Sequence, residues 1–156
     1  MSKQVNGKSV SLYIDESKLR NSVHGDLFSC VDCHKSANDP VNKNLRRPAA
    51  CVDCHADEQK AYEHSQHAKA KKDGASTANC ADCHGGAHEI LAAGDPRSTV
   101  NHANIPTTCG KCHTEMDKTL AQSVQGQAIA RGNGPAQVCT DCHGIHSTKT
   151  HSHSLP

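Results

Sequence analysis

The chain has 156 residues and a formal net charge of +1, and Leu, Ile, Val and Phe together supply only 22 of its residues. That share lies below the roughly 20% expected of a chain that builds its own core, so the polypeptide alone is not expected to bury enough apolar surface to fold. Its scattered basic residues, without nearby aromatic side chains, argue against nucleic acid binding. No apolar run is long enough to span a membrane.

The predicted elements are few and short. Alternating residues at 9–15 predict an isolated strand. Helices are predicted at 16–24, 57–72 and 115–131. The glycines that end these helices are Gly25, Gly74 and Gly132. We therefore expect a mostly irregular fold with short α-helices and little or no sheet.

All ten cysteines belong to one motif, C-x-x-C-H, which occurs five times. This spacing is the attachment signature of c-type haem. Two cysteines three residues apart are neighbours on a helical turn, so both thiols can form thioethers with the vinyl groups of one porphyrin, and the histidine that follows can bind the iron. The five sites are Cys30, Cys33 and His34; Cys51, Cys54 and His55; Cys80, Cys83 and His84; Cys109, Cys112 and His113; and Cys139, Cys142 and His143.

Zinc sites and disulfides are the alternatives for these cysteines. Paired C-x-x-C motifs do build zinc sites, but zinc does not require a histidine directly after the second cysteine, and five pairs leave one pair unmatched. Disulfides would explain the even number of cysteines but not the five histidines. We predict five covalently bound haem c groups, and these macrocycles would replace the missing hydrophobic core.

The sequence also contains an internal repeat. Cys51 precedes Cys109 by 58 residues, and Cys80 precedes Cys139 by 59 residues. Such a period indicates repeated structural units. We therefore predict one pentahaem domain over 1–156. It divides into a half unit (1–48), two two-haem repeats (49–106 and 107–146) and a polar tail (147–156).

The repeat ranks the histidines outside the motifs as sixth ligands of iron. His24 in SVHG and His67 in SQHA occupy equivalent positions, and His88 and His146 closely follow the third and fifth motifs. We predict that these four histidines are distal ligands. His64, three residues before His67, is the main competitor on that helix.

One copy of the repeat departs from this pattern. The third copy reads SVQG, so Gln125 stands where a histidine is expected, and we predict that His102 replaces it as the fifth distal ligand. His151 and His153 lie in the polar tail and are expected to be solvated. Lys111 stands between the cysteines of the fourth motif, where the other motifs carry Asp, and we expect it to raise the potential of that site.

These motifs resemble the multihaem c-type cytochromes of respiratory bacteria, in particular the NapC/NirT and cytochrome c3-like groups. The likeness runs from Asp15 to His146 and lies in the S-x-H-G helices and the C-x-x-C-H sites. It implies an irregular fold wrapped round a stack of five bis-histidine haems. It also implies electron transfer between a membrane quinol-oxidising donor and a periplasmic or extracellular acceptor.

Electron transfer is the preferred function because two imidazoles saturate each iron, so we do not expect an enzyme. Two alternatives remain open: a multihaem reductase with one open-coordination haem, and a subunit of an extracellular haem wire, which would be a homo-oligomer. Since haem is attached outside the cytoplasm, we expect a periplasmic or extracellular protein, although MSKQVNGKSV shows no signal peptide.

Overall fold

The computed structural model describes residues 2–5, 8–11, 13–35, 51–132 and 136–149. The predicted domain boundary at 48/49, most of the polar tail, His151 and His153 lie outside the described residues. Within them the chain is mostly helical and irregular, as predicted. The helical elements are α1 (Glu16–Arg20), α2 (Cys30–Cys33), η2 (Cys51–Asp53), α3 (Ala56–Glu63), α4 (Gln66–Lys72), α5 (Cys80–His84), η3 (His102–Asn104), α6 (Ile105–Gly110), α7 (Thr114–Gln122), α8 (Val124–Ala130) and α9 (Cys139–His143).

The strand predicted as isolated is shorter and is paired. Strand β1 (Ser2–Val5) pairs antiparallel with β2 (Lys8–Ser11), with Ser2 opposite Ser11 and Val5 opposite Lys8. The prediction missed β1, whose backbone supplies the hydrogen-bonding partners that an isolated strand would lack. The sheet of the described residues consists of these two strands.

The helices predicted at 57–72 and 115–131 are each divided into two shorter helices, and a serine stands at each division. The Ser65 side chain accepts a hydrogen bond from the Ala68 amide at 3.1 Å, and the Ser123 side chain accepts one from the Gly126 amide at 3.1 Å. A serine that caps in this way starts a new helix. The chain therefore changes direction between α3 and α4 and between α7 and α8. Helix α1 likewise ends at Arg20, earlier than predicted.

The described residues contain almost no hydrophobic core. Their buried apolar side chains are Ala68, Ile105 and Val138. The accessible surface is 11937 Å² for a mass of 16.6 kDa, whereas a compact monomer of this mass exposes about 7,600 Å². Large apolar side chains remain exposed, among them Val124 at 80% and Leu27 at 72%. The polypeptide is therefore an open framework rather than a self-packed domain.

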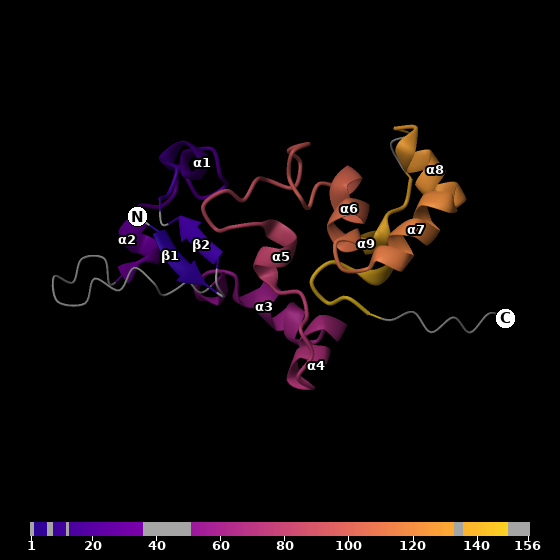
Figure 1. The fold of residues 1–156 in the computed structure, drawn as a ribbon, viewed down its shortest axis with the longest axis horizontal. Helices are drawn as coiled ribbons and strands as arrows, with labels where there is room; N and C mark the ends of the chain where they lie inside the picture. Colours follow the sequence, from indigo (N-terminus) through magenta and orange to yellow (C-terminus); the bar gives the residue numbers. More distant parts are fainter. Residues whose placement is uncertain (1, 6–7, 12, 36–50, 133–135, 150–156) are drawn as a thin grey trace.

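The elements are spread along the long axis of the molecule (Figure 1). The hairpin, α1 and α2 lie at one end, α7 and α8 lie at the other, and α5 lies between them. Contacts join α6 to α7 and α9, and α3 to α4. None of the helices in the described part of the chain has the length and apolarity needed to cross a membrane.

Candidate haem-binding sites

Three of the five C-x-x-C-H motifs form a short helix that begins at the first cysteine: α2, α5 and α9. In each, the aspartate between the cysteines accepts a hydrogen bond from the backbone amide just before the helix. The pairs are Asp32 with Ser29 at 2.7 Å, Asp82 with Asn79 at 2.8 Å, and Asp141 with Val138 at 2.7 Å. These aspartates thus stabilise the first turn, which holds the two thiols on one side.

The same hydrogen bonds affect the charge of these aspartates. Bonds from the Ser29 hydroxyl and amide lower the pKa of Asp32. The Val138 amide, and after it His102, lower the pKa of Asp141. Hydrogen bonds to the charged form favour it, so both carboxylates are negative at neutral pH.

The fourth motif has a different local structure, which explains why Lys111 replaces aspartate. Helix α6 already contains Cys109, because it begins at Ile105. The amide before Cys109 therefore does not lie at a helix start, and no carboxylate is needed to cap it. The expected effect of Lys111 on a potential stays a prediction.

Thiols of the second to fifth motifs lie close to one another. Burial raises the pKa of Cys80, with a further contribution from contact with the Cys51 thiol. Burial also raises the pKa of Cys109 to about 11, and the neighbouring Cys139 thiol adds to this effect. Cys83 has a raised pKa from burial, and its neighbours include Cys112. The second, third, fourth and fifth motifs are therefore spatial neighbours in chain order.

Four motif histidines each face a histidine from outside the motifs. The distances between ring centroids are 6.3 Å for His55 and His24, 6.0 Å for His34 and His88, 6.1 Å for His113 and His67, and 6.0 Å for His84 and His146. All four outside partners are the histidines that the repeat ranked first. The structure thus brings the predicted proximal and distal ligands together in pairs.

The separation of these rings suits a shared iron. Metal–imidazole bonds in proteins are about 2 Å long, so two imidazoles on opposite sides of one iron place their centroids about 6 Å apart. Burial lowers the pKa of both His67 and His84, with smaller contributions from His113 and His146 respectively. A neutral imidazole has a free lone pair for a metal. The donor set, two imidazoles with two nearby thiols, therefore fits a haem attached through sulfur.

The pairs follow a rule that the sequence does not reveal. A histidine in a Ser-x-His element skips the motif that follows it in the sequence and pairs with the motif after that. His24 precedes the first motif and faces the second, and His67 precedes the third motif and faces the fourth. A histidine that closely follows a motif pairs with the motif two places earlier in the sequence. His88 follows the third motif and faces the first, and His146 follows the fifth motif and faces the third. Each pair therefore joins distant parts of the chain.

This rule changes the interpretation of Gln125. A histidine at 125, before the fifth motif, would serve a sixth motif, and this sequence has five. Glutamine at that position therefore deprives none of the four paired sites of a ligand. The structure places His102 against the fifth motif, with its Nε2 3.0 Å from Asp141 Oδ2. Its assignment as the fifth distal ligand stays a prediction.

Glycine directs the chain from a motif to the histidine that follows it. Gly85 and Gly144 have φ of 84° and 81° and end α5 and α9. This left-handed conformation is strained for other residues. It turns the chain so that His88 and His146 leave their own motifs and reach the first and third sites. The second and fourth motifs lack this glycine and are followed directly by α3 and α7.

Two motif histidines have an oxygen atom near Nδ1, and for His143 the distance is that of a hydrogen bond. His143 Nδ1 lies 2.9 Å from the Lys149 carbonyl oxygen, and His55 Nδ1 lies 3.7 Å from Glu58 Oε2. Metal-bound histidines usually donate their second N–H to a carbonyl or carboxylate. Nδ1 of His34 is buried without a hydrogen-bond partner among the described residues.

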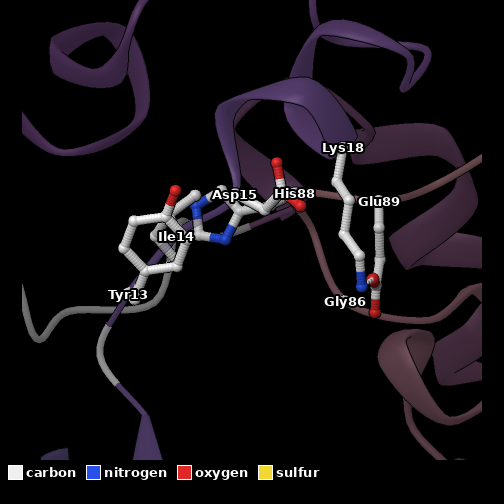
Figure 2. Close-up of a pocket in the computed structure, with 7 residues that line it drawn as sticks. All are labelled: Tyr13, Ile14, Asp15, Lys18, Gly86, His88 and Glu89. Atoms are coloured by element: carbon white, nitrogen blue, oxygen red, sulfur yellow. Dashed lines mark hydrogen bonds and ion pairs between the residues drawn. The ribbon is translucent and has the colours of Figure 1, made fainter.

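Two hollows adjoin paired histidines. The first, of about 200 Å³, lies beside His88, and Figure 2 shows Tyr13 and Ile14 from the stretch before α1 at its edge. The second, of about 320 Å³, lies beside His84 and contains Lys18 and Arg97. Lys18 and Glu89 form an ion pair of 3.0 Å across the gap between α1 and the loop after α5. The hollows thus offer apolar walls and cations next to two of the sites.

No protein-family model, no curated protein and no solved structure matches this chain. Within the described residues, no group of three or more His, Cys, Asp or Glu side chains is arranged to hold a bare metal ion.

Proposed function

We propose that the protein is an electron carrier that holds five covalently attached c-type haems, most of them bound by two histidines. One observation carries this proposal: four motif histidines each lie 6.0–6.3 Å from a histidine outside the motifs. Both rings of each pair belong to the set expected from the repeat. The open framework supports it as well, because the macrocycles would supply the missing core.

Bis-histidine ligation favours electron transfer over catalysis. Two imidazoles occupy both axial positions of an iron, so no position remains for a substrate. The ligand pair also favours a lower potential than His/Met ligation does. Lys18 and Arg97, which line the hollow beside His84, form ion pairs with Glu89 and Asp95.

The neighbouring thiols support a continuous route for electrons. Cys51 contacts Cys80, Cys83 lies near Cys112, and Cys109 contacts Cys139. Haems attached at these thiols would therefore be neighbours from the second site to the fifth. The His34–His88 pair links the first site to the segment that follows the third motif. In the proposed route, electrons would therefore pass between the first site and the later sites by way of the third site.

A reductase with one open haem is the second candidate, and glutamine in place of histidine at position 125 would be its main support. The pairing rule weakens that support, because position 125 does not serve a motif of this sequence. We further propose redox proteins as partners, namely a quinol-oxidising donor and a periplasmic or extracellular acceptor, and a location outside the cytoplasm. The subunit of a haem wire is a variant that electron microscopy of concentrated protein would reveal as filaments.

The deciding experiment is expression with an export leader in a host that attaches c-type haem. The purified chain should carry five haems by pyridine haemochrome assay and mass spectrometry. A redox titration followed by EPR should show at least four low-spin centres. A colourless chain, or one that holds a compact fold without porphyrin, would contradict the proposal. A strong high-spin signal that changes with cyanide or nitrite would favour the reductase.

A further inference from the structure

The segment 143–149 contacts three of the candidate sites. His143 belongs to the fifth motif, and the ring of His146 lies 6.0 Å from that of His84 in the third motif. Thr148 reaches α4, where its hydroxyl oxygen lies 3.3 Å from Nδ1 of His67. His67 in turn lies opposite His113 of the fourth motif. One short piece of chain therefore touches ligands of the third, fourth and fifth sites.

We propose that Thr148 is a positioning residue for His67, the distal ligand of the fourth site. Its hydroxyl accepts a hydrogen bond from His67 Nδ1–H, which leaves the lone pair of Nε2 directed at the iron. This inference rests on the proposed function, because it requires His67 to bind a haem.

The backbone holds Thr148 in place independently of its hydroxyl. The Gln66 amide donates to the Thr148 carbonyl oxygen at 3.0 Å, directly beside His67. One residue further on, the Lys149 amide donates to the His143 carbonyl oxygen at 3.0 Å, and the Lys149 carbonyl oxygen lies 2.9 Å from His143 Nδ1. The segment is thus attached on both sides of the Thr148 side chain. Removal of the hydroxyl should leave this attachment intact.

The chemistry of imidazole explains what the hydroxyl would do. A neutral imidazole carries one N–H, and an acceptor at one ring nitrogen places the lone pair at the other. Hydrogen bonds of this kind fix the ring of a metal ligand and raise its basicity. A more basic ligand stabilises ferric over ferrous iron. Thr148 should therefore lower the potential of the fourth site and restrict the rotation of the His67 ring.

The test compares Thr148→Val with Thr148→Ser in the haem-loaded chain. Valine keeps the shape and removes the acceptor, whereas serine keeps the hydroxyl. In the valine variant the midpoint potential of the fourth site should rise by about 59 mV. This shift corresponds to a tenfold increase in the ratio of reduced to oxidised haem at a fixed solution potential. Its EPR g values should shift as well, while the serine variant restores both. Thr119→Val is the matched control, because the Thr119 hydroxyl donates to the backbone carbonyl oxygen of Glu115 on the exposed helix α7 and not to a histidine.

His67→Ala identifies the affected centre, because it should convert the same centre to high spin. The inference is overturned if Thr148→Val moves no potential, if serine does not restore the shift, or if the shifted centre differs from the one lost in His67→Ala. Failure of the proposed function is distinguishable, because the wild-type chain would then lack low-spin haems altogether.

Discussion

His34 and His88 face each other at 6.0 Å with their ring planes 28° apart, although His34 belongs to the first motif and His88 follows the third. An iron bound between them would join two distant segments of the chain. The His84–His146 pair repeats this relationship one unit later, with ring planes 26° apart. Haem binding would therefore cross-link an open framework, as a metal does in domains that fold only when it binds.

Substitution of one outside histidine should affect a single site. In His88→Ala, we expect one of the low-spin centres to become high spin and to bind cyanide, because the first site loses its distal ligand. EPR and visible spectra of the ferric protein measure this change. His64→Ala is the control, because His64 is exposed at the end of α3, and its substitution should leave every spectrum unchanged. An unchanged spectrum in His88→Ala would contradict the pairing.

The pairing rule also makes a prediction for position 125. Gln125→His restores the Ser-x-His pattern, but the rule directs this position to a sixth motif that the sequence lacks. We therefore expect the numbers of low-spin and high-spin centres to stay as in the wild type. A high-spin centre that disappears in this variant would show that position 125 faces one of the five sites after all.

The aspartates between the cysteines should contribute to stability through helix capping. Asp82→Ala removes the acceptor for the Asn79 amide and should lower the free energy of unfolding by about 1 kcal/mol. Lys111→Ala should have almost no effect, because α6 continues through the fourth motif. Thermal unfolding of the two haem-loaded variants, followed by circular dichroism, compares them. Equal losses in both would argue against the capping role.

The turn after the third motif requires a residue with a left-handed backbone conformation. Gly85 has a φ of 84°, and a Cβ built there meets no atom within 4 Å. Gly85→Ala should therefore cost about 1–2 kcal/mol through backbone strain alone, and it should disturb the site that His88 serves. Gly94→Ala is the matched control, since Gly94 also has open space but no positive φ. Thermal unfolding should separate the two variants, and identical midpoints would contradict the prediction.

One ion pair predicts a dependence of stability on pH. Hydrogen bonds from the Arg97 side chain, and then from its amide, lower the pKa of Asp95 to about 2. The unfolded value is about 3.9, so the pair stabilises the fold above about pH 4 and loses this effect as the pH falls towards 2. The effect should be small, because the Arg97 side chain is 73% exposed.

The measurement is the difference in Tm between the wild type and Asp95→Asn from pH 6 to pH 2. The difference should be positive at pH 6 and should vanish near pH 2, and 1 M salt should reduce it. A difference that grows with acidity would have the wrong sign for a lowered carboxyl pKa.

The sequence alone determined the local chemistry of this protein. The C-x-x-C-H spacing predicts two thiols and an imidazole on one helical turn, and the repeat selects His24, His67, His88 and His146 from the remaining histidines. The low apolar content predicts the lack of a core. These features depend on neighbouring residues or on comparison between repeats, so they can be recognised without a fold.

Only the tertiary structure decided which histidine faces which motif, because ring pairing depends on where distant segments meet. His24 lies close to the first motif in sequence, yet it faces His55 of the second. The breaks at Ser65 and Ser123 rest on local hydrogen bonds of these serines, but the sequence did not mark them because serine is also tolerated within helices. No motif marked Thr148, whose contact with His67 arises only because the end of the described chain returns to α4.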